Sequence, residues 1–173
     1  QDSTAYLAWA GEAIRRDVRY VVLGDVGVAA TPDNLALINR LLSPLGLTHK
    51  GVIVSPTRGS SIETKSPELV GYECNIDPVL PAYPLIETAS DETKVSLAIR
   101  LPKHEGDRSS TLVATNDRGG FAALHYEFCH QSAPLHLGKW LIDPFKFFEA
   151  ALGLETAPIP DVTTVSGRRL FFS

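Results

Sequence analysis

The chain has 173 residues, of which 44% are apolar and 21% are charged, with a formal net charge of -4. This length fits one domain, and the apolar content is too high for a disordered chain. No apolar run approaches the roughly 18 residues needed to cross a bilayer. A mildly acidic chain lacks the basic face of a nucleic-acid-binding protein. Two cysteines are too few for a disulfide scaffold.

The first third of the chain predicts a strand–helix–strand unit. After a first helix over 5–16, the apolar run 19–25 predicts a strand buried on both faces, as in a parallel sheet. A capped, amphipathic segment over 31–46 predicts a helix, and the apolar run 51–54 predicts the next strand. Short connections between these elements predict a right-handed crossover and parallel strands.

The middle of the chain is less regular. Residues 55–68 predict a loop, and 69–74 predict a short strand. Residues 75–91 contain three prolines, too many for a helix. Alternating apolar residues over Lys94–Leu101 predict a half-buried strand, followed by a charged, exposed turn over 103–110.

Residues 111–128 are compatible with two structures. A strand over 111–114, a turn over 116–120 and a strand over 121–128 would form a hairpin. The last segment also fits a short helix, because Phe121, Leu124 and Phe128 fall on one helical stripe. Both alternatives place the two consecutive glycines in a turn.

A clearer helix is predicted after Asp143, with Pro144 in its first turn and Gly153 at its end. Phe145, Phe148 and Leu152 are expected to form its buried face. The elements together predict one α/β domain over 1–157, with an open, mostly parallel twisted sheet flanked by helices. Its expected class is flavodoxin-like or class I amidotransferase-like, with an antiparallel edge allowed.

Two turns are candidate ligand-binding sites. Residues 24–27 follow the first strand, where such folds bind phosphates, but the pattern lacks the third glycine of a dinucleotide fingerprint. Residues 116–120 form a glycine-containing turn, for which a structural role is favoured over a ligand loop. The candidate ligand-binding residues are Asp25, Asn116, Asp117, Gly119 and Gly120.

No catalytic or metal-binding residue is predicted. The histidine and cysteine cluster is poorly suited to zinc, because the side chains of the adjacent Cys129 and His130 diverge; its members are His125, Cys129, His130 and His136. Cys74 and Cys129 also lack the glycine-flanked elbow of an amidotransferase nucleophile. We therefore expect no metal, no cofactor and no catalytic set in this chain.

Two segments near the end of the chain carry a resemblance to a known family. They are WLIDPFKFFEAALGL at 140–154 and PIPDVTTVSGRRLFFS at 158–173. Both resemble the middle region of the large PelA-type proteins of Pel exopolysaccharide biosynthesis. Leu69–Glu73 and the pair Gly119 and Gly120 are similar to the same region, more loosely. In that family an α/β domain lies between a glycoside hydrolase and a metal-dependent polysaccharide N-deacetylase.

The resemblance implies a periplasmic parent protein that processes an amino-sugar exopolysaccharide of the biofilm matrix, with this chain as a non-catalytic accessory domain. Residues 158–173 would form an extended linker into the deacetylase domain. The absence of methionine, even at position 1, is also expected of an interior segment. The implied partners are the neighbouring hydrolase and deacetylase domains, the polysaccharide or another assembly protein. The alternative is a free-standing, amidotransferase-like or small-ligand-binding domain that uses Asp25, Cys74 or Cys129.

Overall fold

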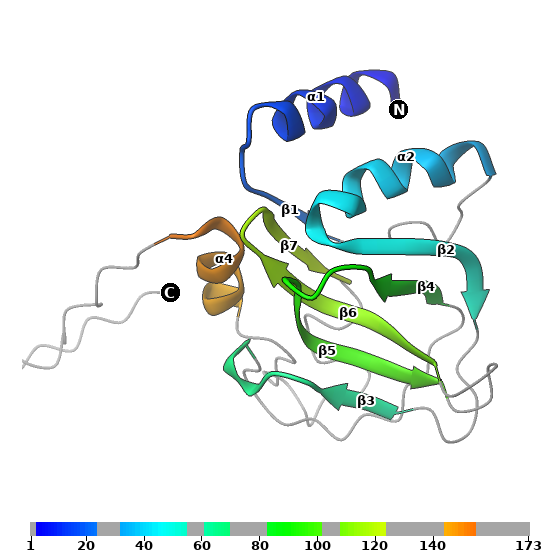
Figure 1. Cartoon of the computed structure of the whole chain (residues 1–173), viewed down its shortest axis with the longest axis vertical. Helices are drawn as coiled ribbons and strands as arrows, with labels where there is room; N and C mark the ends of the chain where they lie inside the picture. The colour runs from blue at the N-terminus through cyan, green and yellow to red at the C-terminus, as the bar shows by residue number, and fades with distance from the viewer. Residues whose placement is uncertain are drawn as a thin grey trace, which may run out of the picture.

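The structure is a computed structural model that describes residues 3–23, 32–54, 61–69, 83–101, 108–123 and 144–154. Figure 1 shows the elements in this part of the chain, with two helices above the sheets and a third beside the end of β7. In chain order they are α1 (Ser3–Arg15), β1 (Tyr20–Leu23), α2 (Pro32–Leu42), the 3-10 helix η1 (Ser43–Leu45), β2 (Leu47–Val54), β3 (Ser61–Thr64), the 3-10 helix η2 (Pro67–Leu69), β4 (Tyr83–Thr88), β5 (Lys94–Leu101), β6 (Arg108–Asn116), β7 (Gly119–Ala122) and α4 (Pro144–Leu152).

The described strands form two sheets. A five-stranded sheet has the order β1-β7-β6-β5-β3, and β2 and β4 form a separate pair. Within the larger sheet β1 runs parallel to β7, whereas the β7–β6, β6–β5 and β5–β3 pairs are antiparallel. The prediction of an open, mostly parallel sheet is therefore wrong: the sheet is mixed and mostly antiparallel.

The predicted strand–helix–strand crossover fails because β1 and β2 belong to different sheets. β1 pairs with β7, which lies far along the chain, whereas β2 runs antiparallel to β4. Gly51, Val52 and Ile53 of β2 are exposed, although a strand inside a parallel sheet is covered on both faces. The apolar residues of β2 therefore indicated a strand, but they did not indicate which other strand would pair with it.

A short connection accounts for the antiparallel pairing of β6 with β7. Residues 89–93 join β4 to β5, and Asp117 and Arg118 join β6 to β7. Parallel neighbours need a much longer crossover, so the connection through Asp117 and Arg118 requires β6 and β7 to form a hairpin, whereas β4 and β5 lie in different sheets. The antiparallel β6–β7 pair confirms the hairpin alternative for 111–128 as far as residue 122, but Gly119 and Gly120 lie in β7 and not in the turn. Residues 124–128 lie outside the described residues. The sequence pattern predicted no strand at β3 or β4, so these two strands were missed. Pro84 is tolerated in β4 because it lies near the start of the strand.

Several local predictions are confirmed. The predicted helices correspond to α1, α2 and α4, and β5 has the predicted bounds. Gly46 and Gly153 end η1 and α4 with φ angles of 67° and 63°, the left-handed conformation common at helix ends. β5 differs from the prediction in burial, because Ser96 and Ala98 are buried together with Leu97 and Ile99.

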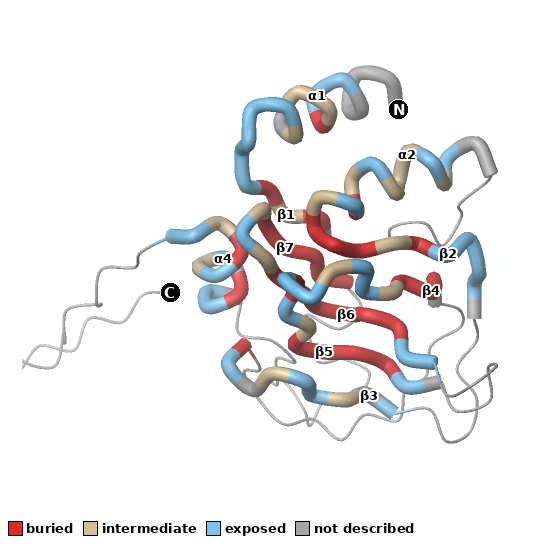
Figure 2. The backbone as a smooth tube through the Cα atoms, in the orientation of Figure 1, coloured by how far each residue is buried: buried red, intermediate tan, exposed pale blue. Residues whose placement is uncertain are grey.

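The core follows the centres of β5, β6 and β7, which Figure 2 shows as buried along most of their length. On α4 the buried residues are Phe147 and Ala151. Phe145 is 80% exposed and Phe148 is 36% exposed, so the predicted buried face of this helix is wrong. Phe147 and Ala151 instead approach Gly120 of β7, where the missing side chain leaves space for them.

Side chains from the larger sheet and from the β4–β5 turn satisfy carbonyl groups at the C-terminal end of α2 and η1. The last carbonyls of a helix have no partner within it, and here three side chains supply one. The hydrogen bonds run from Tyr20 Oη to Leu41 O (2.7 Å), from Asn116 Nδ2 to Pro44 O (3.0 Å) and from Thr93 Oγ1 to Leu45 O (2.9 Å). They fix the end of α2 against the sheet.

Tyr20 makes the fold sensitive to alkaline pH. Burial raises the pKa of Tyr20 from 10.0 to about 12. The folded protein therefore holds this proton more tightly than the unfolded chain, and its stabilisation is complete below pH ~10 and lost as the pH rises through ~12. We expect a loss on the order of 2 kcal/mol in unfolding free energy across that interval. Urea titrations at successive pH values should show a shallower alkaline decline for Tyr20→Phe; equal declines would contradict this assignment.

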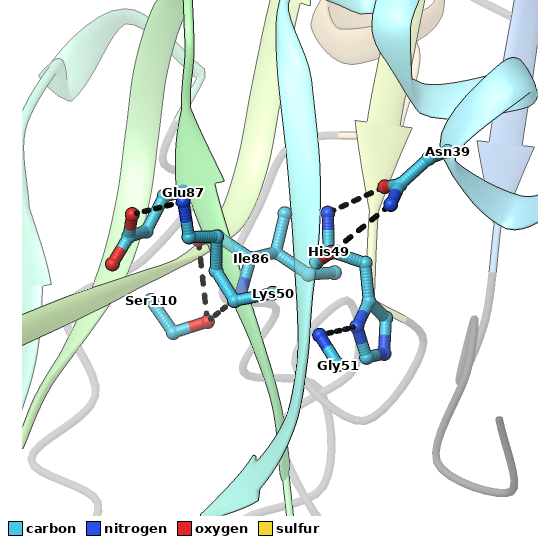
Figure 3. A network of polar contacts seen from close by, with 7 residues as sticks. All are labelled: Asn39, His49, Lys50, Gly51, Ile86, Glu87 and Ser110. Carbon is cyan, nitrogen blue, oxygen red and sulfur yellow. Dashed lines mark hydrogen bonds and ion pairs between the residues drawn. The ribbon is translucent and has the colours of Figure 1, made fainter. Parts of the chain in front are cut away.

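A polar network ties α2 to β2, as Figure 3 shows. The Asn39 side chain accepts a hydrogen bond from His49 N (2.8 Å) and donates one to His49 O (3.1 Å), as a neighbouring strand would. The buried His49 ring accepts a bond from Gly51 N at Nδ1 (2.9 Å). Because Nδ1 is an acceptor here, the neutral ring carries its proton on Nε2.

Ser110 joins the two sheets through its side chain. Its hydroxyl accepts a hydrogen bond from Ile86 N (2.9 Å) and donates one to Pro84 O (3.0 Å). Lys50 and Glu87 add an ion pair between β2 and β4 at 3.3 Å (Figure 3). A buried hydroxyl on β6 thus takes the place of backbone pairing between β4 and β6.

Candidate functional site

A pocket of about 390 Å³ lies where β5 begins and β6 ends. Its volume is within the range of roughly 300–1,000 Å³ that is usual for small-molecule sites. We call it the sheet-end pocket, and its lining residues come from five separate segments of the chain. They are Arg19, Ser66, Glu68, Leu69, Glu92, Lys94, Ser96, Thr115, Asn116, Asp117 and Ala150.

The strand register builds one wall of the pocket. Lys94 pairs with Thr115 across β5 and β6, and Thr115 pairs with Gly120 across β6 and β7. Paired residues point to the same face of a sheet, so Lys94 and Thr115 lie beside the space above Gly120. A Cβ atom on Gly120 would lie 2.7 Å from Ala151 Cβ. Gly120 therefore lets α4 approach closely enough for Ala150 to complete the wall.

Ser96 is the most deeply buried of the polar residues that line this pocket. It is 1% exposed, and its hydroxyl oxygen has no hydrogen-bond partner among the described residues. The β5–β6 register shifts between Val95 and Leu97, so Ser96 occupies a β-bulge, a feature that re-aims side chains near functional sites. A buried hydroxyl without a partner is rare and requires an explanation.

The backbone of Ser96 also shapes the pocket. Its carbonyl oxygen accepts hydrogen bonds from Lys65 N (2.8 Å) and Ser66 N (3.4 Å). These bonds hold the segment after β3 against β5. Ser66 and Glu68, which lie on that segment, are thereby positioned at the side of the pocket.

Charged residues surround the entrance. Glu68, Glu92 and Asp117 carry negative charges and are exposed, as are Arg19 and Lys94. The Arg19 guanidinium lies against Gly153 at the end of α4, where the helix dipole favours a cation. The three carboxylates exceed the two cations by one, so the entrance is weakly negative.

The predicted ligand-binding residues separate into two groups. Asn116 and Asp117 line the sheet-end pocket, but the Asn116 amide is occupied by Pro44 O and by Arg118 N (2.9 Å). Gly119 and Gly120 are buried in contact with β1 and α4 and do not line it. Asp25 lies outside the described residues.

Sequence reasoning missed most of this pocket. Arg19, Glu68, Glu92 and Lys94 are ordinary surface charges in the sequence, and only the fold gathers them. Ser96 offered a weak signal, as a small hydroxyl in the middle of an apolar strand. That residue also fits the solvent side of a half-buried strand, which is how the alternating pattern was interpreted.

Other candidate groups do not form a second site in the described part of the chain. The histidines and cysteines of the predicted cluster, with Cys74, lie outside it. Within the described ranges, no three His, Cys, Asp or Glu residues could jointly hold a metal ion, and no helix there is long and apolar enough to span a membrane. A groove of about 870 Å³ lies between α1 and α2. Among the described residues, the buried hydroxyl without a hydrogen-bond partner is that of Ser96, which lines the sheet-end pocket and not this groove.

The sheet-end pocket offers hydrogen bonds and charge to a small polar molecule. The hydroxyls of Ser66, Ser96 and Thr115 can each donate and accept a hydrogen bond, and the carboxylates at the entrance can accept further ones. Comparisons of the chain with protein-family models, with curated proteins and with solved structures found no match.

Proposed function

We propose that this chain is a non-catalytic accessory domain of an exopolysaccharide-processing protein of the Pel type, and that its sheet-end pocket holds one saccharide unit of the polymer. The observation that carries the proposal is the buried Ser96 hydroxyl, which has no hydrogen-bond partner among the described residues, in a pocket of small-molecule size. Saccharides present many hydroxyls, each of which can donate and accept, and they match a lining of hydroxyls and carboxylates.

The resemblance of residues 140–154 and 158–173 to the PelA-type middle region supports the biological setting. In this proposal the domain works in the periplasm, between a glycoside hydrolase and a polysaccharide N-deacetylase. Ala150, from α4, lines the pocket and lies just before the segment that resembles the linker to the deacetylase. A polymer unit held in the pocket would therefore be retained near the next domain, and this role requires no cofactor.

A titration of the chain with a short N-acetylhexosamine oligosaccharide tests the proposal. Single-unit contacts of this kind should give a dissociation constant near the millimolar range, equivalent to about -4 kcal/mol. Glu92→Gln removes a carboxylate at the entrance and is expected to weaken binding by about three- to tenfold. Calorimetry or NMR line positions would measure the change.

Asp91→Asn is the matched control for that variant. Asp91 is an exposed neighbour of Glu92 in the β4–β5 turn, but it does not line the pocket. This control should bind the oligosaccharide as the wild type does. The proposal is wrong if the wild type does not bind, or if the two variants weaken binding equally.

A further inference from the structure

We infer that Ser96 is the specificity-determining residue of the sheet-end pocket: its hydroxyl bonds an uncharged hydroxyl of the bound unit, while the acidic entrance rejects anionic units such as uronates. The inference rests on the proposed function, since it concerns which saccharides this pocket accepts. It names a residue and a charge preference that neither the resemblance nor the comparisons supply.

The contrast between Ser96 and Ser110 is the first support. Both are buried serines, on the adjacent strands β5 and β6. Ser110 has a donor and an acceptor for its hydroxyl, at Ile86 N and Pro84 O. Ser96 has neither among the described residues. A buried polar group that lacks a partner destabilises the fold, so alanine would be the more stable choice at position 96 unless a ligand uses the hydroxyl.

The surroundings of Ser96 favour an uncharged partner. The other buried lining residues, Leu69 and Thr115, carry no charge. A carboxylate or phosphate brought to this depth would lose its hydration without a counter-charge beside it. A ligand hydroxyl needs no such compensation, and it can both accept from Ser96 and donate to Thr115.

The entrance adds a preference by charge. Glu68, Glu92 and Asp117 line the pocket with Lys94 and Arg19, so the carboxylates exceed the cations by one. These groups are exposed, so each acts weakly, by about two- to fivefold in affinity. Their combined effect disfavours a uronate relative to a neutral sugar of the same size.

The experiment compares wild type, Ser96→Ala and Ser110→Ala in two measurements. The first is thermal unfolding of each protein, and the second is an NMR titration with a neutral hexose oligosaccharide and a uronate oligosaccharide of equal length. Ser96→Ala should keep or raise the unfolding temperature and bind the neutral oligosaccharide about tenfold more weakly. Ser110→Ala should lower the unfolding temperature and, below it, bind as the wild type does.

The uronate oligosaccharide should bind wild type at least about fivefold more weakly than the neutral one, and the double variant Glu92→Gln, Asp117→Asn should reduce that gap. Unchanged neutral binding by Ser96→Ala, destabilisation by that variant, or equal uronate binding would each overturn the inference. If no saccharide binds but free inositol shifts the Ser96 amide signal, the proposed function fails while the role of Ser96 stands. If a saccharide binds but the Ser96 amide signal does not shift, the proposed function stands and the role of Ser96 is wrong. If neither a saccharide nor inositol binds, both claims are wrong.

Discussion

Replacing Gly119 by alanine is expected to lower the unfolding free energy by about 3–5 kcal/mol, which combines backbone strain and overpacking. Gly119 has a φ of 149°, a conformation that residues with a side chain rarely adopt. A Cβ atom there would also collide with the Tyr20 carbonyl oxygen. β1 cannot move away without breaking its parallel pairing with β7, in which Tyr20 is opposite Gly119.

Gly11→Ala is the matched control for this substitution. Gly11 lies within α1, and a Cβ atom on it would meet nothing within 4 Å. Alanine is the better helix former by about 1 kcal/mol, so this variant should be as stable as the wild type or more stable. Urea unfolding followed by circular dichroism measures both variants. A loss below about 1 kcal/mol for Gly119→Ala would contradict the β1–β7 packing.

Phe147→Ala is expected to cost about 3–5 kcal/mol, the usual range for truncating a buried aromatic residue. Phe147 is 1% exposed, and its ring lies against Gly120 of β7. The substitution would leave a cavity between α4 and the sheet. Because Ala150 of the same helix lines the sheet-end pocket, the variant should also lose affinity for the oligosaccharide.

Phe145→Ala removes the same side chain from the same helix at a position that is 80% exposed. Its effect should stay within about 0.5 kcal/mol. The two variants therefore distinguish the observed face of α4 from the face predicted by periodicity, which placed Phe145 inside. Equal losses, or a larger loss for Phe145→Ala, would show that α4 packs in a different orientation.

Local structure was largely predictable because its causes are local. Gly46, at the end of the 31–46 segment, and Pro144 with Gly153 in α4 act within a few residues of their own positions. The alternation over Lys94–Leu101 likewise gave the correct strand bounds. Periodicity failed on α4 because several apolar stripes were available, and Gly120 of a distant strand decides which one is buried.

Strand pairing was not predictable in the same way. Nothing near β1 in the sequence indicates that it pairs with β7, since that choice depends on the total burial of the assembled sheet. The hairpin connection at 117–118 did carry information, because a connection of that length excludes parallel neighbours. Weighing it more heavily than the strand–helix–strand order would have predicted an antiparallel pair of strands at this point of the sheet.

The candidate site shows the same division. Asn116 and Asp117 could be singled out from a distinctive turn, and both do line the sheet-end pocket. The role of Asn116 could not be foreseen, because Pro44, to which its amide donates, is distant in the sequence. Ser96 becomes notable only when its burial and its lack of a partner are known together.

An NMR titration of the chain with a neutral oligosaccharide tests the ligand-binding role of the sheet-end pocket most directly. The expected result is a saturable shift of the backbone amide signals of Ser96 and Thr115, with Ser110 unaffected, and its loss in Ser96→Ala. A saturable response confined to residues away from the pocket, or no response at millimolar ligand, would contradict that role.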